Sequence, residues 1–167
     1  MGNRCLAAIQ SKKLVMSLNF NSQGFLHETI LLSYEEFQYH FGTNSRRMDQ
    51  INNALPFFRL FHSCGCQTVY IDGSFVSKKK YPGDIDICFD LTPVDKEKIS
   101  TVFPQFFEPN EIGRIHRDLQ CHIFYYYEDV PYYLDLLKED RNGNPKGLVR
   151  LDINDILIYY DQKWEAI

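Results

Sequence analysis

Hydrophobic and polar positions along the chain fall into blocks that predict alternating helices and strands. In "LLSYEEFQYHFG", Ser33 is followed three residues later by Glu36, which is a capping-box pattern and predicts a short helix over residues 34–41. Apolar residues then recur at helical spacing through residues 43–65, where Gly65 is a stop signal. Residues 34–65 are therefore expected to be mainly helical.

The remainder of the chain carries mainly strand patterns. Runs rich in β-branched and aromatic residues predict strands at residues 67–72, 84–91 and 119–127. Thr92 as N-cap predicts a helix after the second of these strands, and the turn-rich "DRNGNPKG" predicts a loop. A short strand over 148–153 and a closing helix capped by Asn154 complete the expected elements.

The order of these elements predicts the fold class. Two helices, two strands, a helix, a strand and a small tail are typical of an α/β or α+β domain with a small mixed β-sheet flanked by helices. A chain of 167 residues fits one domain. We expect residues 24–167 to form this single domain and residues 1–23 to form a flexible or extended N-terminal arm.

Composition narrows the range of partners. A hydrophobic fraction of 44% is enough for a sizeable core, and the net charge of −4 argues against a broad grip on duplex nucleic acid. No apolar stretch approaches the roughly 18 residues that span a membrane, so no membrane partner is expected. Five cysteines, an odd number without a CxxC motif, predict a reduced cytoplasmic protein.

The candidate chemistry lies in "YIDGSFVSKKKYPGDIDICFDL", residues 70–91. Side chains at positions i and i+2 of a strand point to the same face about 6.6 Å apart, so Asp84 and Asp86 are expected to project together. Two carboxylates this close repel unless a cation lies between them. The pair therefore predicts a site for a divalent metal, Mg²⁺ or Mn²⁺.

The Gly-Ser pair of the same stretch supplies features that bind an anion. If the strand ending at residue 72 turns directly into a short helix at Gly73, free backbone N–H groups point toward an incoming phosphate. Ser74 adds a hydroxyl donor, and the lysines Lys78, Lys79 and Lys80 follow within reach of the same triphosphate. Either half alone is common in turns and solvated strands, but their conjunction favours a nucleotide site.

The motif also resembles a known family. "GSFVSKKKYPGDIDI" resembles the signature of the nucleotidyltransferase superfamily related to DNA polymerase beta, and residues 24 to 152 resemble short bacterial nucleotidyltransferase-like proteins. The resemblance implies a nucleotidyltransferase-like fold that holds an NTP and two Mg²⁺ ions. By motif match, Gly73 and Ser74 would hold the triphosphate, while Asp84 and Asp86 would hold metal.

One catalytic position departs from that family. The superfamily takes a third carboxylate from a later strand, and the matching strand "CHIFYYYED" carries His122 there. An imidazole can accept a proton or bind Mn²⁺ or Zn²⁺ but is a poor ligand for Mg²⁺. The expected catalytic residues are therefore Asp84, Asp86 and His122, with Asp118 too far along the strand and Asp129 and Asp135 as other candidate carboxylates.

Two functions remain open from the sequence. The first is a metal-dependent nucleotidyltransferase that moves a nucleotidyl group from an NTP to an unknown protein, RNA or small-molecule acceptor, by analogy in a toxin–antitoxin or phage-defence pair. The second is a catalytically degenerate module of the same fold that binds a nucleotide or a protein partner. The short length also suggests a protein partner or a homodimer.

Overall fold

The computed structural model describes residues 17–165 and contains a mixed α/β arrangement of helices and strands. The elements are β1 (Ile30–Leu31), α1 (Tyr34–Phe41), α2 (Ser45–Ser63), β2 (Thr68–Asp72), the 3₁₀ helix η1 (Gly73–Val76), β3 (Ile85–Asp90), α3 (Lys96–Val102), α4 (Pro109–Leu119), β4 (Cys121–Tyr126), α5 (Tyr132–Leu137), β5 (Val149–Asp152) and α6 (Ile153–Glu165). The mixed α/β class expected from the sequence is therefore confirmed.

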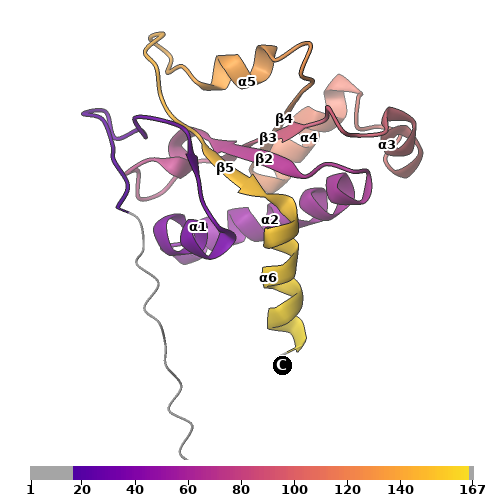
Figure 1. Ribbon diagram of the computed structural model, residues 1–167, viewed down its shortest axis with the longest axis horizontal. Coiled ribbons are helices and arrows are strands. Elements are labelled where there is room, and N and C mark those ends of the chain that lie inside the picture. Colours follow the sequence, from indigo (N-terminus) through magenta and orange to yellow (C-terminus); the bar gives the residue numbers. More distant parts are fainter. Residues whose placement is uncertain (1–16, 166–167) are drawn as a thin grey trace, which may run out of the picture.

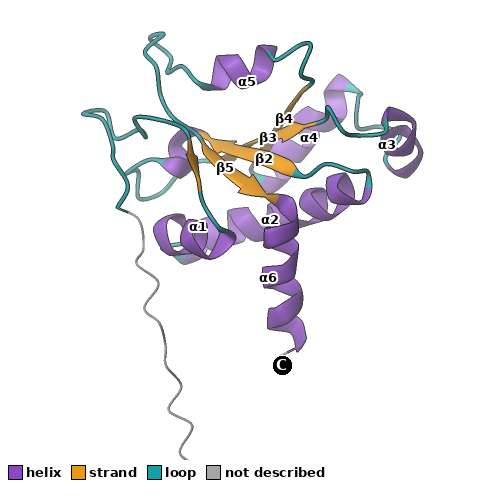
Figure 2. Cartoon of the chain, in the orientation of Figure 1, coloured by secondary structure: helices purple, strands orange, loops and turns teal. Residues whose placement is uncertain are grey.

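The strands form one mixed sheet in the order β1-β5-β2-β3-β4 (Figure 2). β2 runs antiparallel to both β3 and β5, whereas β3 and β4 are parallel, as are β1 and β5. The end of β2 and the beginnings of β3 and β4 therefore meet at the same edge of the sheet. Loops that leave or enter the sheet there can place side chains next to one another.

Helices cover the two faces of the sheet unequally. α1, α2 and α6 lie against one face, and the short α5 lies over the other (Figure 1). The main core lies on the first face, where the Phe61 ring is 4.2 Å from that of Phe89 and 4.8 Å from that of Phe106. Under α5 a smaller core is built from Cys88, Tyr126, Leu134, Leu137 and Leu148.

Several predicted elements are confirmed with their local causes. Ser33 caps α1, and both hydrogen bonds of the capping box with Glu36 are present. α2 ends at the predicted place, where Gly65 adopts a left-handed φ of +105° that favours glycine. The Gly-Ser pair forms η1 directly after β2, as expected.

Two helix starts were predicted wrongly. α3 is capped by Asp95, whose carboxylate accepts backbone N–H bonds, while the Thr92 hydroxyl accepts the Glu128 N–H. α6 begins before Asn154, and the Asp152 carboxylate accepts the N–H of that residue. In each case an aspartate near the predicted cap supplies the stronger, charged acceptor.

Helix α4 is the main element that the sequence prediction missed, since no helix was expected between the one after Thr92 and the third strand. Ile112, Ile115 and Leu119 follow the spacing of one helical face, and Ile115 is buried. Charged residues and Gly113 between them obscured this pattern. β1 and α5, two and six residues long, were also missed because such short elements leave little periodicity.

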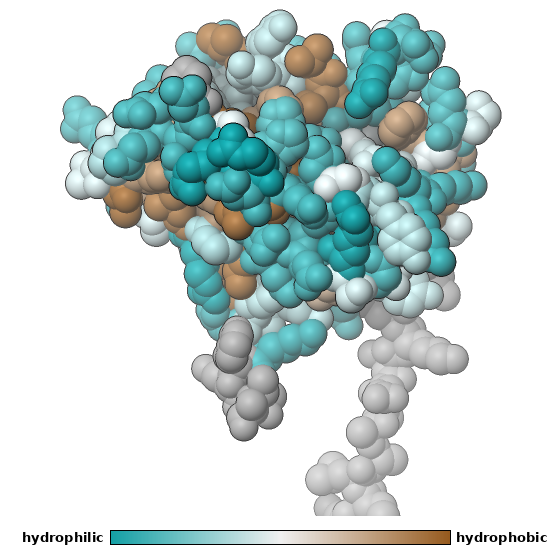
Figure 3. Space-filling view, turned by 180° about the vertical axis from the view of Figure 1, so that it is seen from behind, coloured by the Kyte–Doolittle hydropathy of each residue, from teal (hydrophilic) through white to brown (hydrophobic). Residues whose placement is uncertain are grey.

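The predicted N-terminal arm, residues 1–23, lies for the most part outside the described residues. In its described part, Leu18 and Phe20 pack against the core, and Phe20 forms a β-bridge with Leu26. Within residues 17–165, no helix is long and apolar enough to cross a lipid bilayer. From behind, the surface is mainly hydrophilic, with apolar side chains in smaller patches (Figure 3).

The described cysteines are free and buried. Burial raises the pKa of the Cys66, Cys88 and Cys121 thiols to about 12. They therefore stay protonated near neutral pH and pack as small apolar side chains.

Arg47 on α2 fixes the long connection between β2 and β3. Its side chain is buried, with 3% exposed, and its pKa is lowered by that burial. The guanidinium donates to the Phe75 carbonyl at 2.6 Å and lies over the Phe75 ring, 4.9 Å from the centroid. Its other acceptors are the carbonyls of Phe41, Ser77, Lys79 and Lys80. The connection is therefore held to α2 through its backbone.

Replacing Arg47 by Met should lower the free energy of unfolding by at least about 2–3 kcal/mol, because several buried carbonyls lose a charged donor. Urea unfolding measures this loss. Arg46→Met is the matched control, since that exposed arginine donates to a single carbonyl, that of Pro82. Equal losses in the two variants would contradict a special role for Arg47.

Candidate functional site

A cleft of about 1050 Å³ opens where the end of β2 meets the starts of β3 and β4. The connection after β2 forms one side, and the loop after α5 forms another. Its lining residues are Gln23, Phe25, Asp72, Gly73, Ser74, Ser77, Lys78, Lys79, Gly83, Asp84, Asp86, His116, His122, Glu139, Asp140, Arg141, Asn142 and Lys146. Most of the residues predicted from the Gly-Ser to Asp-x-Asp stretch are among them.

Strand register places three polar side chains at one level of the sheet. Asp72 on β2 is the register partner of Asp86 on β3, and Asp86 is the register partner of His122 on β4. Neighbouring strands lie about 5 Å apart, so these side chains crowd together at the floor of the cleft. The position predicted for the third catalytic residue is therefore directly beside Asp86.

Gly73 lies against this row and has no room for a side chain. Its φ of +76° is left-handed, and a Cβ built there would lie 2.0 Å from Oδ2 of Asp86. The backbone can therefore approach Asp86 only because the residue is glycine. Gly73 and Ser74 are only partly buried at this point and line the cleft.

Both carboxylates of the Asp-x-Asp motif are engaged by histidines. Asp84 Oδ2 lies 2.8 Å from Nε2 of His116 on α4, and Asp86 Oδ1 lies 3.3 Å from Nδ1 of His122. The two imidazoles stack with centroids 4.4 Å apart and planes inclined by 13°. All four side chains are only partly buried, so a ligand in the cleft can reach them.

A buried ion pair supports the floor from behind. Lys146 Nζ donates to both carboxylate oxygens of Asp72, at 2.6 and 2.7 Å, and the two side chains are only 9% and 4% exposed. Burial nevertheless raises the pKa of Asp72, because the desolvation of the carboxylate outweighs the attraction of the lysine. The carboxylate therefore depends on Lys146 to remain ionised.

The predicted phosphate-binding residues are only partly brought together. Gly73, Ser74, Lys78 and Lys79 line the cleft, whereas Lys80 does not. The Lys80 ammonium lies 5.1 Å from the centroid of the Tyr81 ring. Successive residues of an extended connection point in different directions, so three consecutive lysines cannot all face one ligand.

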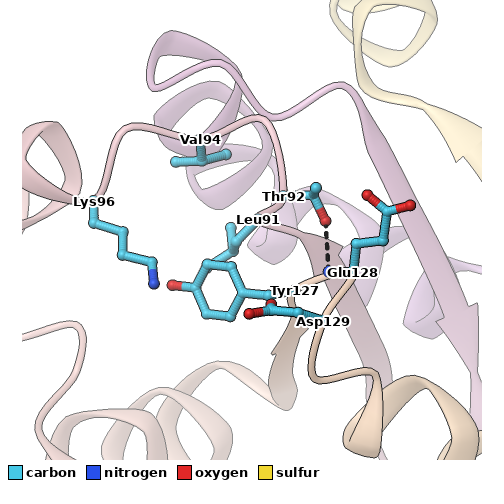
Figure 4. Close-up of a pocket in the computed structure, with 7 residues that line it drawn as sticks. All are labelled: Leu91, Thr92, Val94, Lys96, Tyr127, Glu128 and Asp129. Carbon is cyan, nitrogen blue, oxygen red and sulfur yellow. Dashed lines mark hydrogen bonds between the residues drawn. The ribbon is translucent and has the colours of Figure 1, made fainter.

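None of the other candidate carboxylates lines the cleft. Asp118 lies on α4 beside Arg117, not on a strand, and Asp135 pairs with Lys138. Asp129 lines a separate pocket of about 430 Å³ (Figure 4). In that pocket the Lys96 ammonium lies 4.0 Å from the centroid of the Tyr127 ring, so its aromatic surface already has a partner from the same chain.

Several residues that line the cleft come from outside the Gly-Ser to Asp-x-Asp stretch, among them His116, Lys146 and Arg141. His116 reaches the cleft because α4 is a helix, and recognising the helix would have given a signal for it. Lys146 and Arg141 arrive from the loop after α5, 74 residues after Asp72 in the case of Lys146. No local pattern predicts that approach.

The two carboxylates of the Asp-x-Asp motif would be the ligands for the divalent metal that the resemblance implies. Asp84 and Asp86 face the cleft and offer the hard oxygen atoms that Mg²⁺ prefers. Among residues 17–165, however, no group of three or more His, Cys, Asp or Glu is arranged to hold a metal ion. Each imidazole contacts one oxygen of its carboxylate and would compete with a metal for that oxygen, unless His122 itself served as a nitrogen ligand.

Substituting Gly73 by Ala should displace Asp86 and destabilise the protein. The left-handed backbone alone costs an L-residue about 1–2 kcal/mol, and the contact with Asp86 adds to it. Gly83→Ala is the matched control, since a Cβ at this cleft position meets nothing within 4 Å. Thermal unfolding of the two variants should separate them, and equal stability would contradict the close packing at Gly73.

Substituting Lys146 by Met should cost about 3–5 kcal/mol at neutral pH, because it leaves a buried carboxylate without its partner. Without the lysine the folded-state pKa of Asp72 rises further, so the native state binds the proton more tightly than the unfolded chain. Stability of the variant should then fall as pH rises above about 4, while acid lessens the defect. Urea unfolding from pH 5 to pH 8 measures this slope, and an added Asp72→Asn should remove it.

Comparison with known proteins gives one match. Residues 18–152 match the model of a family described as a family of unknown function, DUF6932. No curated protein and no solved structure matches the chain. The matched range contains every residue that lines the cleft. The chain therefore belongs to the DUF6932 family.

Proposed function

We propose that the cleft binds the triphosphate of a nucleoside triphosphate and that the domain is of the nucleotidyltransferase type. The observation that carries the proposal is the position of His122. Alignment to the nucleotidyltransferase signature predicted this residue at the third catalytic position, and it is the register partner of Asp86, with Nδ1 3.3 Å from Oδ1. If the Gly-Ser and Asp-x-Asp motifs occurred together by chance, the residue aligned to the third catalytic position would not be required to lie beside Asp86.

The anion-binding part of the proposal rests on Gly73 and the residues after it. Gly73 and Ser74 line the cleft side by side at the start of η1. Lys78, Lys79 and Arg141 bring positive charge to the same cleft. Backbone N–H groups together with cationic side chains are the usual recognition elements for phosphate oxygens.

Nucleotidyl transfer is a second candidate, favoured by the two carboxylates Asp84 and Asp86 that face the cleft. A divalent ion held there would neutralise charge on the phosphates. His122 is placed to accept the proton of an acceptor hydroxyl, whose oxygen would attack the α-phosphorus. Pyrophosphate would then leave from the side of Gly73 and Ser74. The acceptor would be a protein, an RNA or a small molecule, by analogy in a toxin–antitoxin or phage-defence pair.

The alternative to transfer is a module that only binds the nucleotide or a protein partner. The two Asp–His pairs favour it, because each imidazole occupies a carboxylate oxygen that a metal would need. Triphosphate binding is common to both functions. The metal dependence of binding separates them.

Calorimetric titration of the four NTPs, with Mg²⁺, with Mn²⁺ and with EDTA, tests the proposal. We expect binding in the cleft, and binding strengthened by metal if the transfer function is present. The double variant Asp84→Asn/Asp86→Asn should lose the metal-dependent gain but keep or increase binding in EDTA, because it removes negative charge near the phosphates.

The matched control is Asp129→Asn/Asp135→Asn, which removes the same charge from carboxylates outside the cleft. A loss of the metal-dependent gain in this control would assign the effect to net charge. Absence of NTP binding by the folded wild-type protein under all three conditions would overturn the proposal. Binding that is identical with metal and with EDTA would leave the nucleotide-binding module as the function.

A further inference from the structure

A row of aromatic rings leads along β4 into the cleft. The Tyr133 ring lies 5.7 Å from that of Phe124, and the Phe124 ring lies 4.1 Å from that of His122. His122 in turn stacks on His116, with centroids 4.4 Å apart and an interplanar angle of 13°. His116 is the last ring of this row, and it lies in the lining of the cleft.

The His116 ring is stacked on His122 and is still partly exposed in the lining of the cleft. One face of the imidazole is covered by His122, yet 40% of the side-chain surface is exposed. Its edge is fixed, because Nε2 lies 2.8 Å from Oδ2 of Asp84. A flat ring held at its edge and covered on one face is a preorganised platform for a second flat ring.

We infer that the base of the nucleotide stacks on the other face of His116 and extends this aromatic row, an inference that rests on the proposed binding of an NTP. The contacts along the floor of the cleft support this placement. Gly73 packs on Asp86, and Asp84 lies two residues before Asp86 on the chain. Asp84 in turn contacts His116. A nucleotide with its triphosphate at Gly73 therefore extends past the two carboxylates toward His116.

Stacking on His116 predicts which nucleotides the site should bind more tightly. Every nucleobase has an aromatic face, so stacking tolerates all four bases but favours purines, which offer the larger ring system. A stacked base should strengthen binding by about 5- to 100-fold over the same phosphates without a base. Inorganic tripolyphosphate is the matching probe without a base.

Phe25 is the competing platform, since it is the other aromatic side chain that lines the cleft beside the two histidines. It lies near the phosphate-binding part, because it forms a β-bridge with Ser77 and its ring centroid is 5.5 Å from the Lys146 ammonium. A base over Phe25 would require the opposite orientation of the nucleotide. Phe25→Leu is therefore the control that separates the two placements.

The experiment compares calorimetric affinities for ATP, CTP and tripolyphosphate in the wild-type protein, His116→Ala, His116→Phe and Phe25→Leu. The readout is the ratio of ATP affinity to tripolyphosphate affinity. We expect a ratio of about 5 to 100 in the wild type, a smaller value for CTP, and a ratio near 1 in His116→Ala. His116→Phe should keep the wild-type ratio, because it retains a flat ring and loses only the contact with Asp84.

Three results would overturn the inference. An unchanged ratio in His116→Ala, or a ratio lost in Phe25→Leu instead, would place the base elsewhere. A His116→Phe variant that behaves like His116→Ala would show that His116 acts through Asp84 and not by stacking. Failure of the folded wild-type protein to bind tripolyphosphate or any NTP would overturn the proposed function, and the stacked base with it.

A measurement on the wild-type protein covers the case in which the variants do not fold. Protons of a base stacked on an imidazole shift upfield in the NMR spectrum and show nuclear Overhauser effects to the His116 ring. Their presence in the ATP complex supports the inference. An ATP complex with effects to Phe25 and none to His116 would contradict it.

Discussion

The cleft depends on a buried cation that binds backbone and not a carboxylate. Arg47 reaches from α2 to the carbonyls of the connection between β2 and β3, and no carboxylate of the described residues pairs with it. A buried guanidinium must find acceptors for its five donors, so the connection cannot move away without leaving either the cation or the carbonyls unsatisfied. Because these carbonyls turn toward α2, the Gly73 and Ser74 backbone stays at the cleft.

The second constraint is the crowding of negative charge that the register produces. Asp72 and Asp86 are paired across adjacent strands, and Asp84 lies two residues from Asp86. Three carboxylates at such separations repel one another, and each one has a basic partner from a different part of the chain. Lys146 reaches Asp72, His116 reaches Asp84 and His122 reaches Asp86. Because these three basic side chains are engaged with carboxylates, they also determine how much positive charge in the cleft is left to attract an anionic ligand.

Sequence reasoning selected several residues that line one cleft, although it missed some of the elements around them. Gly73, Ser74, Asp84 and Asp86 could be predicted because they lie within one short stretch in which strand geometry fixes the direction of side chains. His122 could be aligned because it occupies a strand beside that stretch. Long-range partners such as Lys146 could not, since a buried ion pair between distant residues leaves no local pattern.

Helix α4 shows a different cause of failure. Its apolar face is there in the sequence at Ile112, Ile115 and Leu119, but the intervening charges and Gly113 obscure the helical spacing. Without the helix, the direction of the His116 side chain could not be predicted. Its contact with Asp84 became evident only from the structure.

The separation of Asp72 and Lys146 along the chain has a consequence for how the protein is made. The two residues are 74 positions apart, and the strand that follows Lys146, β5, lies between β1 and β2 in the sheet. A ribosome exposes β2, β3 and β4 well before either Lys146 or β5 has emerged. Until then the Asp72 carboxylate has no cation, and one side of β2 has no neighbour. The cleft is thus completed near the end of synthesis, and a chain cut short before Lys146 would keep the whole Gly-Ser to Asp-x-Asp motif without the charge balance that supports it.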